Sequence, residues 1–335
     1  MRTLAVFAFA ACSGGGGGGD AGQQVDAPTQ DDGQQQGVGL SEQYPGDNGI
    51  AGDPAVIWFE DFEAASVAAI TGRYDQAQGV ARMALTSDAP KGNALAMTSG
   101  GAVSAVDLYK RLPDHDDVFV RWYAKYDANI RWHHSGMWIG GYNPGMTFPS
   151  PMAGRRPVGN DRFSIALEPV WGSGTASARF DFYNYWMGMQ SWMLPPVNDN
   201  GTAYYGNSLV HRNSFTIDEN QWVCLEVHVR LNPSATTAAG AVLEVWKNDA
   251  LVTRLDDAGP MGYWLRGKWC ASNSDGQECT DYPAQPDEIL SLQFRNTTAF
   301  GVNAFWPQNY ITESIMGTLR FDQMVVATTR VGCMR

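Results

Sequence analysis

The stretch Trp222-Val223-Cys224-Leu225-Glu226-Val227-His228-Val229-Arg230-Leu231 alternates between apolar and polar side chains. Every second residue from Val223 to Leu231 is Val or Leu, whereas Glu226, His228 and Arg230 stand between them. Successive side chains of a β-strand point to opposite faces of its sheet, so this period of two predicts a strand. One face of that strand is expected to enter a hydrophobic core and the other to remain polar.

Similar stretches recur from about residue 55 to 328, separated by clusters of Gly, Pro, Asn and Asp, and helical periodicity is scarce. Many antiparallel strands with one apolar face each predict an all-β fold of two packed sheets, a β-sandwich or jelly roll, in a single domain. Lys247-Asn248-Asp249-Ala250 has the composition of a hairpin turn. Segments 142–161 and 187–221 are expected to form loops beside a groove. The predicted strands are Val56–Glu63, Ala94–Thr98, Asp116–Tyr126, Ser135–Gly140, Arg162–Val170, Arg179–Trp186, Trp222–Leu231, Ala241–Lys247, Ile289–Arg295 and Gly317–Ala327.

Two aromatic-rich stretches, Arg131–Gly141 and Arg179–Trp186, gather polar and aromatic side chains on one predicted face. A period of two places His133 with Arg131 and Ser135, and the tyrosines of the second stretch with Arg179 and Asp181. A sheet face rich in Arg, His and Tyr is suited to a sugar-binding groove.

The N-terminal part of the chain predicts export. Residues 1–12 have one Arg, a short apolar run and small residues before Cys12, and they resemble a bacterial lipoprotein signal with a lipidated Cys12. The alternative is an ordinary secretory leader. Residues 13–53 are rich in Gly, Gln and Asp and predict a disordered tether, which leaves 54–335 as the folded domain.

Charge and cysteine content narrow the partners. The formal net charge of −12 argues against nucleic acid as a partner. Segment 121–180 has more Lys and Arg than Asp and Glu, so an anionic ligand stays open.

The cysteine content predicts disulfides. If Cys12 is lipidated, four cysteines remain, and in an exported chain we expect the disulfides Cys270–Cys279 and Cys224–Cys333.

The chain resembles the concanavalin A-like jelly rolls, especially the polysaccharide lyases that act on alginate and glucuronan. The resemblance rests on Trp58–Glu63, on Trp222–Pro233 with Leu243–Asp249, and on Arg320–Thr328. In those lyases a basic residue, often Lys, precedes a Gly-rich run by three positions. Here His133 stands three residues before Gly136, and other jelly-roll lyases divide the chemistry between a His and a Tyr. The resemblance therefore implies catalytic roles for His133 and Tyr185.

Lyase chemistry removes the proton α to the sugar carboxylate and expels the 4-oxygen, which requires a base, an acid and a cation that neutralises the carboxylate. His133, Tyr183 and Tyr185 are the candidate base and acid. For His134, which stands between Trp132 and Trp138, we expect a structural role. The alternative for Tyr183 and Tyr185 is that they are ordinary sheet residues, since Tyr is enriched in strands. The candidate substrate-binding residues are Arg121, Arg131, Arg179, His228, Arg230, Gln293 and Arg295.

Two functions follow. The first is an exported polysaccharide lyase that cleaves a uronate-containing polymer by β-elimination; the alternative is a non-catalytic, glycan-binding surface lipoprotein. We expect a monomer that touches the membrane only through a lipid anchor, either on the outer membrane or cell surface of a Gram-negative bacterium or secreted. No cofactor is required, and Glu60, Glu63 and Asp322 are candidate oxygen ligands for a structural calcium ion.

Overall fold

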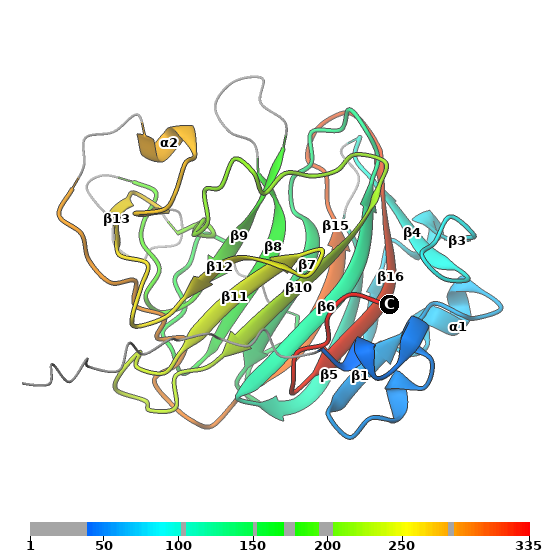
Figure 1. Cartoon of the computed structure of the whole chain (residues 1–335), viewed down its shortest axis with the longest axis horizontal. Coiled ribbons are helices and arrows are strands. Elements are labelled where there is room, and N and C mark those ends of the chain that lie inside the picture. The colour runs from blue at the N-terminus through cyan, green and yellow to red at the C-terminus, as the bar shows by residue number, and fades with distance from the viewer. Residues whose placement is uncertain (1–38, 102–104, 150–152, 171–177, 194–203, 281–284) are drawn as a thin grey trace, which may run out of the picture. The chain divides into compact units, whose positions relative to one another are not determined.

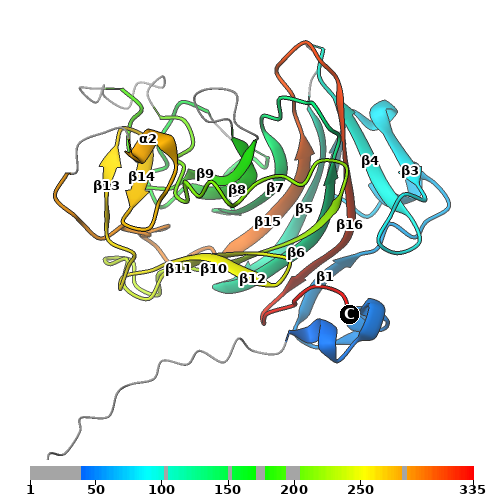
Figure 2. The same cartoon turned by 45° about the horizontal axis from the view of Figure 1, so that its top comes forward.

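The computed structural model describes residues 39–101, 105–149, 153–170, 178–193, 204–280 and 285–335. Residues 38–335 form one compact unit. Two antiparallel sheets dominate it and pack face to face (Figures 1 and 2). The fold is the predicted jelly roll of two antiparallel sheets.

The larger sheet follows the order β12-β11-β10-β6-β16-β4-β3, and β1 also pairs with β16. Its strands are β12 (Ala250–Leu255), β11 (Val242–Lys247), β10 (Trp222–Arg230), β6 (Asp117–Tyr126), β16 (Gly317–Ala327), β4 (Ala94–Ser99), β3 (Met83–Thr86) and β1 (Val56–Glu60).

The smaller sheet follows the order β2-β5-β15-β7-β8-β9. Its strands are β2 (Gln76–Gln78), β5 (Val106–His115), β15 (Val302–Asn309), β7 (Ser135–Tyr142), β8 (Arg162–Val170) and β9 (Arg179–Tyr185). A separate hairpin joins β13 (Gly262–Leu265) to β14 (Lys268–Ala271). The helical segments are short: α1 (Val67–Thr71), α2 (Gln277–Thr280), and the 3-10 turns η1 (Leu40–Glu42), η2 (Pro45–Asp47), η3 (Ile50–Gly52) and η4 (Val80–Arg82).

One hydrophobic cluster fills the space between the sheets. The alternating Val and Leu residues of β10 meet the apolar side chains of β8 and β9 there, including Leu167 and Phe182. The opposite faces are polar: Glu226 and His228 lie on the outer face of the larger sheet, and Glu168 and Tyr183 lie on the outer face of the smaller one. The period-two pattern thus assigns the two faces of these strands correctly.

Most predicted strands match observed strands, and the turn between β11 and β12 has both Asn248 and Asp249 at positive φ, as a two-residue hairpin turn requires. The prediction of a strand at Ile289–Arg295 was wrong. Leu290, Leu292 and Phe294 are buried, but the backbone N–H groups of Phe294 and Arg295 donate to the side chain of Asn232 instead of a neighbouring strand. The strands that the sequence analysis missed are β2, β3, β5, β12, β13, β14 and β15.

The predicted tether was too long at its C-terminal end. Residues 40–52 form three 3-10 turns, and Leu40 and Ile50 pack against the outer face of the larger sheet. There Asp47 forms an ion pair with Arg121 at 2.5 Å, with both side chains fully buried. The rest of the predicted tether, the leader and Cys12 lie outside the described residues.

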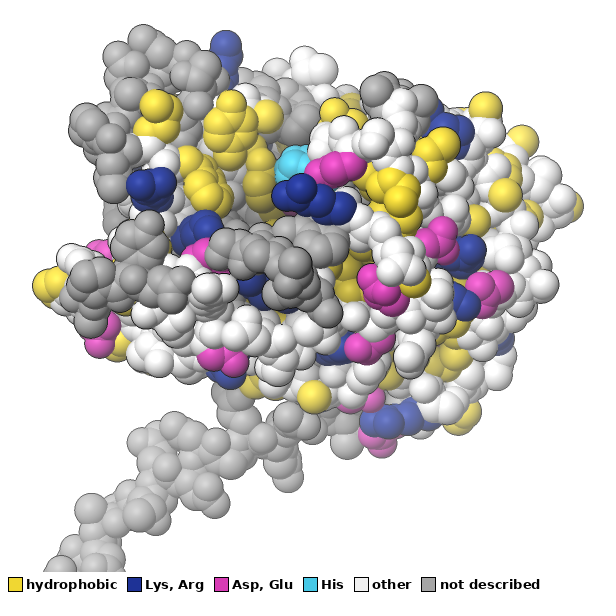
Figure 3. All heavy atoms as spheres, turned by 90° about the horizontal axis from the view of Figure 1, so that it is seen from above, with side chains coloured by type: hydrophobic (Ala, Val, Ile, Leu, Met, Phe, Trp, Pro, Cys, Tyr) yellow, Lys and Arg dark blue, Asp and Glu magenta, His cyan; other side chains and the backbone are white. Residues whose placement is uncertain are grey.

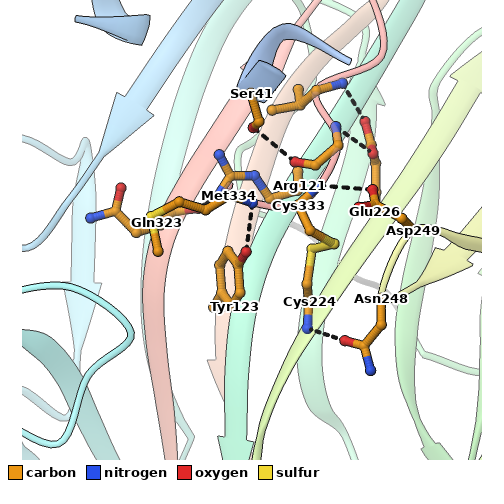
Figure 4. The surroundings of a disulfide bond; sticks show 12 residues. Ser41, Arg121, Tyr123, Cys224, Glu226, Asn248, Asp249, Gln323, Cys333 and Met334 are labelled. Carbon is orange, nitrogen blue, oxygen red and sulfur yellow. Dashed lines mark hydrogen bonds between the residues drawn. A yellow bond between two sulfur atoms is a disulfide. The ribbon is translucent and has the colours of Figure 1, made fainter. Parts of the chain in front are cut away.

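The C-terminal segment closes the same face (Figure 4). The Glu226 carboxylate accepts hydrogen bonds from the N–H groups of Val331 and Gly332, and Cys333 is bonded to Cys224. The second predicted disulfide, Cys270–Cys279, is also present. Two disulfides are typical of an exported protein. Among the described residues, no helix has the length and hydropathy needed to span a membrane.

Candidate active site

The candidate site is a cavity of about 590 Å³ on the outer face of the smaller sheet. Its lining residues lie on β8, β9, β14 and α2 and in the segments that connect strands, and Figure 2 shows these four elements near one another. Viewed from above, a patch of histidine, acidic and basic side chains lies beside hydrophobic ones (Figure 3). The lining residues are Arg131, His133, His134, Glu168, Val170, Arg179, Tyr183, Trp192, Tyr205, Ser208, His211, Lys268, Glu278 and Glu313.

Another part of this sheet face is covered by the chain itself. Phe148 packs edge-on against Tyr109 and Tyr142, and Arg111 lies over its ring at 4.4 Å. The rings of Trp306 and Trp138 stack on each other with their centroids 5.3 Å apart, and both side chains are almost fully buried. These aromatic side chains therefore cover the part of this sheet face that lies near β5. The cavity lies at the other part of the face, near β9.

His133 and His134 both line the cavity, although strict alternation places them on opposite faces. His134 has a φ of 52°, in the left-handed region, so the backbone turns just before β7 begins at Ser135. The two rings stack at 3.8 Å. The structural role preferred for His134 is therefore corrected: its side chain faces the cavity rather than the core around Trp132.

The two histidines have different surroundings. Burial and the neighbouring His134 lower the pKa of His133, and its Nδ1 lies 3.1 Å from the hydroxyl of Thr312. Burial would also lower the pKa of His134, but the Glu168 carboxylate, 3.0 Å from its Nδ1, outweighs burial and raises it. The two surroundings therefore favour the neutral form of His133 and the protonated form of its neighbour His134.

Tyr183 is the tyrosine that reaches the cavity. Its ring meets that of His134 edge-on at 4.9 Å, and its hydroxyl lies 3.2 Å from the hydroxyl of Tyr185. Tyr185 is 1% exposed and does not line the cavity, so it lies behind Tyr183. Burial, together with Tyr185, raises the pKa of Tyr183, which keeps its phenol protonated. A side chain at Gly206 would collide with the Tyr183 ring, so glycine is required there.

Another part of the cavity lining carries a second charged group. Arg179 donates to Glu278 at 2.8 Å, and Lys268 lies 3.4 Å from the same carboxylate. His211 Nδ1 lies 3.2 Å from the Arg179 guanidinium, and burial lowers the pKa of His211. Glu278 belongs to α2, where the adjacent Cys279 is tied to Cys270 beside Lys268. The disulfide thus holds this carboxylate at the cavity.

Of the predicted substrate-binding residues, only Arg131 and Arg179 line the cavity. The expected placement of the other five in the groove was wrong, because they belong to the larger sheet or to loops bonded elsewhere. Arg121 pairs with Asp47, and His228 lies between Asp117 and Glu244. The remaining three donate to backbone carbonyls: Arg230 to Gly240, Gln293 to Ala235, and Arg295 to Phe300.

The candidate calcium ligands are occupied within the protein. Glu60 pairs with Arg73, Glu63 accepts from Asn93, and Asp322 accepts from the N–H of Lys91. Within the described part of the chain, no group of three or more His, Cys, Asp or Glu side chains is arranged to hold a metal ion.

Glu168, His211, Lys268 and Glu278 are cavity residues that were not among the predicted site residues. Glu168 had a signal, since alternation placed it on the polar face of β8. Residues 268 and 278 reach the cavity through tertiary contacts of the hairpin β13–β14 and of α2, which sequence periodicity does not encode.

Of the comparisons with known proteins, the one with solved structures supports the fold. The scan against family models found no match, and no curated protein matched the sequence. Among solved structures, the marine PL-14 alginate lyase from Aplysia kurodai superposes with a TM-score of 0.53 at 13% identity, covering 82% of this chain and 99% of that one. A mutant of the alginate lyase Aly36B in complex with alginate trisaccharide superposes with a TM-score of 0.51 at 10% identity, covering 81% of this chain and 98% of that one. The chain therefore has a jelly-roll fold shared with alginate lyases.

Proposed function

We propose that this protein is a polysaccharide lyase that cleaves a uronate-containing polymer by β-elimination. The observation that carries the proposal is the meeting of His133, His134 and Tyr183 at one cavity, where the surroundings lower the pKa of His133 and raise the pKa of His134 and of Tyr183. Structures that share the fold are alginate lyases, one of them holding an alginate oligosaccharide, which supports a polysaccharide as the partner.

His133 is the proposed base. When its Nδ1 donates to Thr312, Nε2 keeps a lone pair that can take the proton α to the uronate carboxylate. The electron pair of that C–H bond forms the new C=C bond, and the bond from carbon 4 to the glycosidic oxygen breaks. Tyr183 returns a proton to the departing oxygen, so that the two fragments leave as an unsaturated uronate and a free hydroxyl.

The developing negative charge on the substrate carboxylate needs a cation close by. Protonated His134, held by Glu168, supplies one, and Arg131 at the cavity rim supplies another. Arg131 is 65% exposed and only 3.8 Å from Glu313, so its guanidinium can turn towards a bound carboxylate. Tyr185, which was predicted to be catalytic, is proposed here to position the Tyr183 hydroxyl.

The test is the ultraviolet absorbance of the unsaturated product, measured with the whole chain on a panel of uronate polymers. Replacing His133 with Ala or Tyr183 with Phe is expected to lower kcat by about 10²- to 10⁴-fold, the usual contribution of a general acid or base. His115→Ala is the matched control, because His115 lies on β5 outside the cavity lining. Full activity in both cavity variants would refute the assignment; binding without turnover in the wild type would favour the glycan-binding alternative.

A further inference from the structure

His133, the base proposed above, is the last member of a chain of hydrogen bonds that begins at a carboxylate. Its Nδ1 lies 3.1 Å from the hydroxyl of Thr312, in the loop between β15 and β16. The same hydroxyl donates to Oε2 of Glu313 at 3.2 Å. A threonine hydroxyl therefore stands between the Glu313 carboxylate and the imidazole.

The direction of these hydrogen bonds follows from the hydrogens available. A carboxylate only accepts hydrogen bonds, whereas a threonine hydroxyl has one hydrogen to donate and lone pairs with which to accept. Hydrogen bonds to a charged group are the stronger ones, so the hydroxyl hydrogen of Thr312 points to Glu313. Only the oxygen of the hydroxyl remains for His133, as an acceptor. A neutral His133 then has its proton on Nδ1 and a lone pair on Nε2.

His134 makes the corresponding contact without a hydroxyl in between. Its Nδ1 lies 3.0 Å from the Glu168 carboxylate itself, and its ring stacks on that of His133. Burial would lower the pKa of His134, but this direct contact raises it, because a carboxylate stabilises the charged ring. The uncharged hydroxyl of Thr312 orients its histidine without charging it. The two adjacent histidines thus differ because one acid acts directly and the other through a hydroxyl.

The loop between β15 and β16 is held in place beside the histidines. The N–H of Tyr310 donates to the carbonyl of His134 at 3.1 Å, and the N–H of Gly101 donates to the carbonyl of Glu313 at 3.0 Å. These bonds fix the loop on both sides of its hydroxyl. The imidazole of His133 is therefore oriented before a substrate binds, which is the condition for efficient proton transfer.

We propose, building on the lyase function above, that Thr312 and Glu313 are positioning residues that fix His133 as the Nδ1–H tautomer and so make Nε2 the atom that accepts the substrate proton. In the elimination step the C–H proton moves to Nε2. The imidazolium that forms keeps its Nδ1–H bond to Thr312, whose lone pair partly offsets the new positive charge.

The test observes the tautomer directly, by nitrogen NMR of the isotope-labelled histidines in the whole chain, without substrate and at a pH where His133 is neutral. The signals of His133 are identified by their loss in His133→Ala. We expect Nδ1 to be protonated and Nε2 to be unprotonated.

Thr312→Val keeps the shape of the side chain and removes the hydroxyl, so it is expected to populate the Nε2–H form. We expect kcat on a uronate polymer to fall by about 10- to 100-fold, the usual effect of removing a group that orients an imidazole. KM should change little, because Thr312 is not among the residues that line the cavity. Thr312→Ser, which restores the hydroxyl, should restore both the tautomer and kcat.

Glu313→Ala is expected to shift the same tautomer equilibrium, because the Thr312 hydroxyl could then donate its hydrogen to Nδ1 of His133. The matched control is Thr236→Val, which removes another exposed hydroxyl, bonded to that of Ser234 and outside the cavity lining. It is expected to leave the tautomer and kcat unchanged.

A wild-type His133 with its proton on Nε2 would overturn the inference while leaving the lyase function intact, and so would an unchanged tautomer or an unchanged kcat in folded Thr312→Val. If Thr312→Val does not fold, the wild-type tautomer decides. Absence of elimination on every polymer would instead refute the proposed function itself, whichever tautomer His133 has.

Discussion

At the scale of single residues, the protonation state of His133 controls the proposed reaction. Burial and His134 lower its pKa from the ordinary value of 6.5, so it stays neutral, and able to accept a proton, until the pH falls below that value. We therefore predict that kcat/KM has an acidic limb with an apparent pKa below 6.5. An acidic limb with an apparent pKa above 6.5 would contradict this environment for the base.

Glu168 is predicted to control the charge of its neighbour, His134. Because Glu168 outweighs burial and raises the pKa of His134, Glu168→Gln should lower that pKa, leaving a neutral imidazole where a cation is needed. An NMR titration of the His134 ring protons measures the change. Glu313→Gln removes a weaker influence on the pKa of the same ring and should lower that pKa less. An unchanged pKa in Glu168→Gln would show that the pair does not form.

At the scale of elements, His228 joins three neighbouring strands of the larger sheet. It lies on β10 between Asp117 of β6, at 2.7 Å, and Glu244 of β11, at 2.5 Å. Burial would lower its pKa, but these two carboxylates outweigh burial and raise it. A raised pKa in the folded state stabilises the protein at pH values below the unfolded pKa, and this contribution is lost as the pH rises through the folded one.

His228→Phe keeps the aromatic stack on Phe119 and removes the charge. We predict that its loss of unfolding free energy is larger at pH 5.5 than at pH 9, about one unit below and well above the ordinary histidine value. Urea unfolding of both proteins at the two pH values measures it. An equal loss at both would show that the imidazole is not protonated in the native state.

The sequence predicted the strands whose alternation reflects burial on one face, such as β8 and β16, with their observed limits. The prediction failed at residues 289–295, where the alternating residues do not pair with a neighbouring strand. It also failed at His134, where a turn of the backbone interrupts the alternation. Part of the cavity lining could be predicted, because alternation along β9 placed Arg179 and Tyr183 on its polar face. Glu278 and Lys268 reach the site through a disulfide-bonded loop, whose position depends on tertiary packing.

At the scale of the whole molecule, the N-terminal turns are held to the larger sheet by a buried ion pair. Asp47 and Arg121 are both fully buried, so Asp47→Asn should destabilise the protein by about 3–5 kcal/mol, because it leaves the guanidinium uncompensated. Replacing both, as Asp47→Asn with Arg121→Met, should cost less than the single change. Urea unfolding compares them, and a double variant less stable than Asp47→Asn would contradict this account.

The two disulfides should differ in their effects. Cys224–Cys333 spans 109 residues, so its removal as a double Ser variant should cost about 4–5 kcal/mol in a chain-entropy treatment. Cys270–Cys279 spans 9 residues and should cost less stability, but it holds Glu278 at the cavity. Thermal unfolding together with kcat/KM separates the two effects. If kcat/KM on each polymer were the same with and without Cys270–Cys279, the disulfide would not position the cavity wall.

The most direct test of the account is elimination itself, followed as ultraviolet absorbance with the whole chain and uronate polymers. We predict that absorbance rises on at least one polymer, and that the rise is lost in His133→Ala and Tyr183→Phe but kept in His115→Ala. A flat trace on every polymer from folded wild-type protein would contradict the central claim that this cavity performs β-elimination.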